Sequence, residues 1–152
     1  MGRRLTGPIT FRGQVLAPGE AEGTALVLEE PLSLWGGMDP GSGRLIDAHH
    51  PQHHALITGR VLVMASARGS SSSSSILAEA VRAGTAPAAI LLGEAELILA
   101  IGAAVAEELY GRRVPIVVVT PEEVARIADG AAVAVEEGGL VNVKSGGPGS
   151  IN

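Results

Sequence analysis

Short apolar runs alternate with segments of helical length through the second half of the chain, and this alternation limits the possible folds more than any other feature. The runs have the length and the Val, Ile and Leu content of buried strands, whereas the intervening segments have the length and apolar spacing of helices. We predict strands at 61–65, 88–92, 114–119, 131–136 and 140–144, and helices at 74–83, 96–110 and 120–128. This order is typical of a mixed α/β domain whose sheet is at least partly parallel.

The first 60 residues have a different character. Two short strands are predicted at 14–17 and 24–28, separated by a Pro18-Gly19 turn and a further glycine. Residues 31–60 are rich in Gly, Pro, Asp and His, and their apolar residues are too sparse for a long element. Since connections of this length in a compact domain are usually binding loops or disordered segments, we predict a long functional loop there.

The length of 152 residues fits one domain that buries a sizeable core without disulfides or a structural metal. We predict a single domain over 1–152, with loosely ordered ends at 1–10 and 145–152. Because the chain has only one Trp, one Tyr and one Phe, this core must consist of small aliphatic side chains that pack by shape.

Charge and composition exclude several classes of partner. The net charge of −5 removes the positive field that binding to nucleic acid or to an anionic membrane surface needs. The chain has no cysteine, so it cannot hold an iron–sulfur cluster through thiolates. No apolar stretch approaches the roughly 18 residues of a membrane span, and the first residues lack the apolar core of a signal peptide. We therefore expect a cytoplasmic protein that binds neither nucleic acid nor membrane.

A serine turn, which we define as residues 66–72, is the most informative feature for function. Arg68-Gly69 comes before six consecutive serines, Ser70 to Ser75, between a predicted strand and a predicted helix. The glycine lets the backbone pass close to a ligand, and the amide groups at the helix start favour a carboxylate or phosphate. Arg68 and the backbone donors could stabilise an alkoxide on Ser70, which would then act as a base. The alternative is that these serines cap the helix or form a flexible linker.

Three other chemistries of strand-turn-helix motifs do not fit the sequence. A nucleotide-binding P-loop needs a lysine in the turn, and the first lysine of the chain is Lys144. A nucleophile elbow needs a downstream histidine, and a phosphotransfer swivelling domain needs a histidine at the turn itself. No histidine follows His54, so neither of these fits.

All four histidines lie in one short segment, His49-His50-Pro51-Gln52-His53-His54. Clusters of imidazoles in loops can bind transition metals, and a non-enzymatic metal- or ligand-binding module using this segment is one open hypothesis. The alternative is a set of solvated or substrate-facing loop histidines.

The segment Trp35-Gly36-Gly37-Met38-Asp39 could line a substrate site. Gly36 and Gly37 would permit close approach of a ligand, and Asp39 would bind an amine or a hydroxyl group. The alternative is an ordinary turn, because Asp39-Pro40-Gly41 has typical turn composition.

The ordered set of motifs resembles the small subunit of aconitase X over about residues 13–144. The resemblance rests on Gly23, residues 31–40 (PLSLWGGMDP), Gly43, Ile46-Asp47, His50-Pro51, Thr58-Gly59, Arg68-Gly69-Ser70, Ala86-Pro87 and Ala89-Ile90. It implies a swivelling β/β/α domain with a mixed, barrel-like sheet and flanking helices, related to the mobile domain of aconitase.

The resemblance also implies the site residues. The first serine after the glycine is the base in the related aconitase turn, so the catalytic role falls to Ser70. We expect substrate binding by Arg68, Gly69, Ser71, Ser72, Gly36, Gly37, Asp39 and His50. Where the aconitase turn has an arginine and a glutamate after its two serines, this chain has Ser72 and Ser73. Arg68 or a partner chain would then supply the cation that binds the carboxylate.

The implied activity is that of a hydro-lyase, which dehydrates a small hydroxy acid. In this family the metal centre, iron or iron–sulfur, belongs to a large partner subunit, so this chain is expected to bind no metal or cofactor and to be inactive alone. The polyserine turn favours enzymes that convert cis-3-hydroxy-L-proline to Δ1-pyrroline-2-carboxylate. The alternative is the small subunit of a phosphomevalonate dehydratase.

Overall fold

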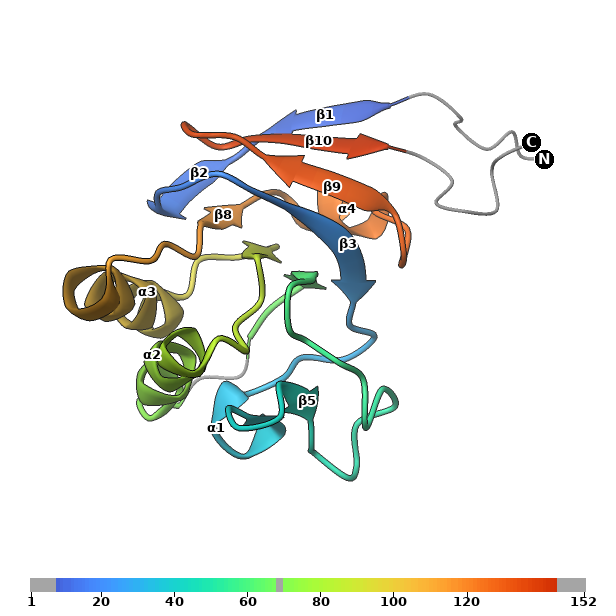
Figure 1. Ribbon diagram of the computed structural model, residues 1–152. Coiled ribbons are helices and arrows are strands. Elements are labelled where there is room, and N and C mark those ends of the chain that lie inside the picture. The colour runs from blue at the N-terminus through green and yellow to red at the C-terminus, as the bar shows by residue number, and fades with distance from the viewer. Residues whose placement is uncertain (1–7, 68–69, 145–152) are drawn as a thin grey trace.

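The computed structural model describes residues 8–67 and 70–144, which form a mixed sheet with flanking helices (Figure 1). The eight strands of the main sheet are β1 (Ile9–Arg12), β2 (Gln14–Ala17), β3 (Ala21–Val27), β6 (Val61–Met64), β7 (Ala89–Leu92), β8 (Ile116–Val118), β9 (Ala132–Val135) and β10 (Leu140–Lys144). Their order is β1-β10-β9-β3-β6-β7-β8-β2. Neighbouring strands from β3 to β8 are parallel and the other pairs are antiparallel. The predicted α/β class with a barrel-like sheet is confirmed.

The sheet nearly closes into a barrel through the continuous segment of β1 and β2. These strands are adjacent in sequence but lie at opposite ends of the strand order. Gly13 joins them, and its N–H donates to the carbonyl oxygen of Gly139 at 2.9 Å. A Cβ at Gly13 would overlap the carbonyl oxygen of Val118, and a Cβ at Gly139 would lie 2.6 Å from the carbonyl oxygen of Gly13. The corner that closes the barrel therefore needs glycine at both positions.

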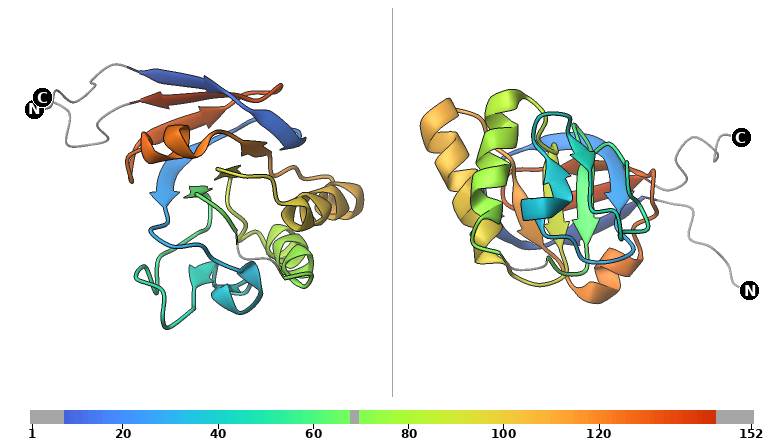
Figure 2. Two further views of the ribbon diagram at one scale, coloured as in Figure 1. Left: turned by 180° about the vertical axis from the view of Figure 1, so that it is seen from behind. Right: turned by 90° about the horizontal axis from the view of Figure 1, so that it is seen from below.

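Two long helices cover one side of the parallel strands. Helices α2 (Ser73–Ala83) and α3 (Leu97–Tyr110) lie side by side there in both views of Figure 2. They are in close contact at Gly102, where a Cβ would lie 2.7 Å from the carbonyl oxygen of Ser74. The start of α2 is thus held directly against α3.

The short helix α4 (Pro121–Ala125) confirms the predicted start of the last helix. The hydroxyl of Thr120 accepts from the N–H of Glu123, while the carboxylate of Glu123 accepts from the N–H of Thr120. The helix ends at Ala125, so the predicted end near 128 is wrong.

The buried strands β6 and β7 are covered on both faces, which explains their unbroken apolar sequence. Leu62, Met64, Ile90 and Leu92 face the helices, and the alternate residues face the interior of the barrel. All eight side chains of these two strands are at most 1% exposed. Because parallel strands run in the same direction, β6 and β7 end at the same edge of the sheet.

The segment 31–60 is not an open loop, although it contains no long element. It contains a single turn labelled α1 (Leu34–Gly37) and a small hairpin of β4 (Met38–Asp39) and β5 (Arg44–Leu45). Five of its apolar side chains are almost completely buried: Leu32, Leu34, Met38, Leu45 and Ile57. They join the core that also contains Leu77 of α2. The segment is therefore a packed layer over the helix side of the sheet.

Two sequence expectations need correction. Ile9 and Thr10 belong to β1, which pairs with β10, so the prediction of a loosely ordered start through residue 10 is wrong for these two residues. The predicted second strand begins three residues earlier, at Ala21, because its first part pairs with β9. Within residues 8–67 and 70–144, no helix is long and apolar enough to span a membrane.

Candidate functional site

The serine turn leaves the carboxyl end of β6 and leads into α2. The end of β7 lies beside it, because a Cβ at Gly93 would be 2.7 Å from the carbonyl oxygen of Ala65. Ligands of α/β proteins commonly bind just outside the carboxyl ends of parallel strands. Two predicted site residues of this turn, Arg68 and Gly69, lie outside the described residues.

Ser70 is half-buried at this edge rather than packed into the core. Its carbonyl oxygen accepts from the N–H of Ser73 at 2.9 Å, which fixes the backbone of the turn. Ser71 and Ser72 are exposed, and Ser72 occupies the cap position of α2 without a capping hydrogen bond from its side chain. The hydroxyl of Ser74 donates to the carbonyl oxygen of Ser71 at 3.0 Å. The predicted roles of Ser70, Ser71 and Ser72 remain predictions.

Ser73, which the sequence analysis gave no role, connects the serine turn to the segment of α1. Its side chain is only 1% exposed. Its Oγ accepts from the N–H of Trp35 at 3.2 Å and lies 3.3 Å from the Oγ of Ser33. The helical spacing of Ser73, Leu77 and Ala80 places all three on one face, and this inward-facing position was the available sequence signal. The structure therefore brings two predicted site segments together through an unpredicted residue.

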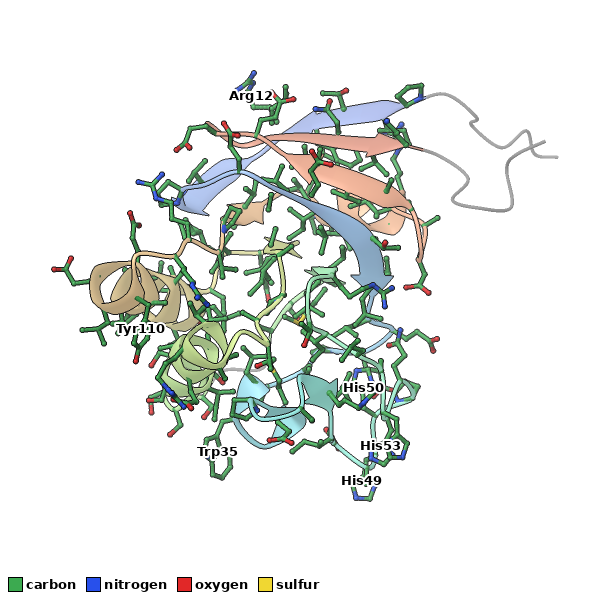
Figure 3. All side chains as sticks on the ribbon, in the orientation of Figure 1. Arg12, Trp35, His49, His50, His53 and Tyr110 are labelled. Carbon is green, nitrogen blue, oxygen red and sulfur yellow. The ribbon has the colours of Figure 1, made fainter. Side chains whose placement is uncertain are left out.

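The turn at α1 explains the two glycines of the predicted binding segment. Trp35 (φ −70°, ψ 119°) and Gly36 (φ 81°, ψ −12°) have the dihedral angles of the central residues of a type II turn, which requires glycine at the second of them. A Cβ at Gly37 would lie 2.6 Å from the Cδ1 of Leu32. Trp35 is 58% exposed at the tip of this turn, and Figure 3 shows it projecting away from the domain.

Asp39 is occupied by its own turn. Its two carboxylate oxygens accept from the N–H of Gly41 at 3.1 Å and from the hydroxyl of Ser42 at 2.8 Å. The hydrogen bond from Ser42, and next that from Gly41, hold the pKa of the Asp39 carboxyl below its ordinary value. These contacts favour the turn interpretation of Asp39, while substrate binding by Asp39 stays a prediction.

His50 is buried, and both of its ring nitrogens have partners within the chain. Nδ1 accepts from the N–H of Gln52 at 3.0 Å, and Nε2 lies 3.0 Å from the carbonyl oxygen of Glu30. Since Nδ1 accepts, Nε2 carries the proton and donates. The amide of Gln52 adds hydrogen bonds to Val27 and Glu29. His50 thus fastens the histidine segment to the chain that follows β3, and its predicted contact with substrate remains untested.

Replacing His50 by alanine should destabilise the domain, because it leaves the N–H of Gln52 and the carbonyl of Glu30 without partners. We expect a loss of about 2 kcal/mol in the free energy of unfolding, measured by urea denaturation. His49→Ala is the control, because His49 is exposed and alanine keeps its backbone bond to Asp47. Equal stabilities of the two variants would contradict the fastening role.

The other histidines do not converge on a metal site. His53 and His54 stack with their ring centroids 3.7 Å apart, and Figure 3 shows His49 at the outer end of the segment. No group of three or more His, Asp or Glu side chains suited to hold a metal ion occurs in the described part of the chain. The geometry therefore gives no support to the hypothesis of a metal-binding module.

The fold is a barrel-like α/β domain with a serine turn at the carboxyl edge of its parallel strands, joined to a packed layer of short elements. The chain belongs to the aconitase X swivel domain family, which matches residues 10–143. The crystal structure of aconitase X from Thermococcus kodakaraensis has a TM-score of 0.80 and 32% sequence identity, and the match covers 89% of this chain and 98% of that one.

Two relatives in other organisms differ in length. The cis-3-hydroxy-L-proline dehydratase of Pseudomonas aeruginosa is 50% identical over 103 residues, which is 68% of this chain and 18% of that protein. The phosphomevalonate dehydratase small subunit of Thermococcus onnurineus is 35% identical over 135 residues, which is 88% of this chain and 98% of that subunit. The chain therefore spans about a fifth of the first relative and nearly all of the second.

Proposed function

We propose that this chain is the small swivelling component of an aconitase-X-type hydro-lyase that dehydrates a small hydroxy acid, with Ser70 as the base. The proposal depends on the position of Ser70, half-buried just before α2 in the turn that follows β6, in a domain of the aconitase X swivel family. At this position the hydroxyl is not buried in the core, and it lies close to the edge that a second component can cover.

The first turn of α2 suits the substrate's carboxylate. Helix α2 has 11 residues, and the positive end of its dipole lies at the serine turn. A carboxylate held there would place the adjacent C–H bond near Ser70. The same partial positive charge lowers the cost of an alkoxide on Ser70, which the role of base requires.

The proposed reaction removes one molecule of water. Ser70 accepts the proton from the carbon next to the carboxylate, and the electron pair of that C–H bond forms the new double bond. The bond between the neighbouring carbon and its hydroxyl group breaks, and this hydroxyl takes up a proton and leaves as water. A positioned base of this kind contributes roughly 10²- to 10⁴-fold in rate.

We propose that the iron or iron–sulfur centre belongs to the large component. This chain has no cysteine, and no suitable group of three His, Asp or Glu residues exists in 8–67 and 70–144. Its residues therefore do not fit a resident metal. We propose that turnover needs the large component, whether it is a separate chain or another part of a longer one.

The proposed substrate is cis-3-hydroxy-L-proline. Loss of water gives the C2=C3 enamine, and transfer of the ring N–H proton to C3 converts this enamine to the imine Δ1-pyrroline-2-carboxylate, the final product. The 50% identity over 103 residues to the hydroxyproline dehydratase of Pseudomonas aeruginosa supports this choice. A phosphomevalonate dehydratase is the alternative, because the second relative matches along almost its entire length.

The test is an assay of this chain assembled with its large component. We expect cis-3-hydroxy-L-proline to be consumed and a cyclic imine to form. The imine is detected by trapping it with 2-aminobenzaldehyde. Neither component by itself should turn over substrate. If the assembly dehydrates phosphomevalonate but not cis-3-hydroxy-L-proline, the alternative substrate takes the place of the proposed one. The proposal would be refuted if the isolated chain had full activity, or if the assembly dehydrated neither acid.

A further inference from the structure

Ser73 and His50 are the polar side chains that are almost fully buried in the described ranges, and their partners differ in kind. His50 joins Glu30 to Gln52, and neither partner belongs to the serine turn. Ser73 is the first residue of α2, and its partners belong to the turn that carries Trp35. A buried hydroxyl at this place therefore links the element that carries the proposed base to the exposed tryptophan.

The link is held rigidly from the side of α2. The N–H of Ser73 donates to the carbonyl oxygen of Ser70, so Ser73 is bonded to the backbone of the serine turn. The next residue, Ser74, is pressed against Gly102 of α3, where a Cβ would lie 3.0 Å from the Cα of Ser74. The Oγ of Ser73 is thus a fixed point.

The turn of α1 depends on this fixed point for its orientation. The N–H of Trp35 is bonded to Ser73, and the hydroxyl of Ser33 is within hydrogen-bond distance of the same oxygen. Leu34, between these two residues, is buried and anchors the turn to the core. Trp35 itself is 58% exposed, and the bond from its N–H to Ser73 holds its backbone close to the start of α2, so its indole is available to a ligand or to a covering component.

We propose that Ser73 is a positioning residue for the dehydration: its buried hydroxyl sets the turn of Trp35 against the serine turn, so that the indole forms one wall of the substrate site. This inference rests on the proposed function. The indole limits the movement of the bound acid relative to Ser70, and it excludes water from one side. Loss of the hydroxyl should loosen the wall without removing the base.

The test is a double-mutant cycle of Ser73→Ala and Trp35→Ala in the assembled dehydratase. We expect each single variant to lower kcat/KM about tenfold, with a rise in KM as well as a fall in kcat, because a misplaced contact costs both binding and orientation. The double variant should be no worse than Trp35→Ala, because Ser73 acts through Trp35. Ser75→Ala, an exposed serine of the same helix, is the control and should match the wild type.

Fluorescence gives a readout that does not need turnover. Trp35 is the only tryptophan of this chain. We expect Ser73→Ala in the full chain to lower the steady-state anisotropy of Trp35 emission, and Ser75→Ala to leave it unchanged. A purely structural role of Ser73 would lower the fraction of folded protein but not the KM of the folded fraction.

The outcomes separate this inference from the proposed function. Suppose that the wild-type assembly is active. If the two substitutions then have additive effects, or if Ser73→Ala has no effect, only the positioning role is overturned. An inactive wild-type assembly overturns the proposed function and this inference with it. Non-additive effects together with lower anisotropy support the inference.

Discussion

Ser70→Ala should reduce kcat of the assembled dehydratase by about 10²- to 10⁴-fold, the typical contribution of a positioned base. The substitution removes the group that accepts the substrate proton but keeps the backbone carbonyl that bonds Ser73. KM should change little, because the carboxylate would still bind at the start of α2. The measurement is steady-state kinetics with cis-3-hydroxy-L-proline.

Ser75→Ala is the matched control for this variant. Ser75 belongs to the same run of serines and is exposed, and its N–H, which donates to the carbonyl oxygen of Ser72 at 3.1 Å, is kept. We expect its kcat to stay within a few-fold of the wild type and the stability of both variants to be unchanged. A Ser70→Ala enzyme that retains kcat within the same few-fold would assign the base to another residue.

The sequence alone predicts the strands correctly wherever a strand is buried on both faces. The runs at Val61–Met64 and Ala89–Leu92 are apolar without interruption because helices cover one face and the barrel interior the other. β1 was missed because Ile9–Arg12 is an edge strand of four residues with two exposed side chains. Its pairing with β10 is a contact between the two ends of the chain, which local patterns do not reveal.

The candidate site was predicted in parts but not as an assembly. The serine turn is a local strand-turn-helix pattern, so the sequence located Ser70 at the start of α2. Segment 31–60 was interpreted as a loop because its buried residues follow neither the period of a strand nor that of a helix. They are single anchors, such as Leu32 and Met38, in a chain of turns. The bond between Ser73 and Trp35 spans 38 positions and depends on this packing.

Gly102→Val should both destabilise the domain and impair catalysis, although Gly102 is remote in sequence from the serine turn. Valine has a higher helix propensity than glycine by a few tenths of a kcal/mol, so propensity alone predicts a slight gain in stability. Packing predicts the opposite, because a Cβ at position 102 meets the backbone of Ser74, which cannot rotate away as a side chain can. Overpacking of this kind typically costs ~1–3 kcal/mol and therefore outweighs the propensity gain.

The overpacked variant can restore normal contact distances only by moving α3 away from the start of α2. That movement would shift the serine turn relative to the large component by a substantial fraction of an ångström, and misplacement by about 1 Å can cost on the order of 10²-fold in rate. We therefore expect Gly102→Val to lose stability in urea denaturation and to lower kcat/KM of the assembly by up to about 10²-fold. Ala104→Val adds the same side chain at an exposed position of α3 and should cost only its helix propensity, roughly 0.6 kcal/mol, with normal kinetics. If the Gly102 variant were as stable and as active as the Ala104 variant, the contact between α3 and α2 would not be what positions the serine turn.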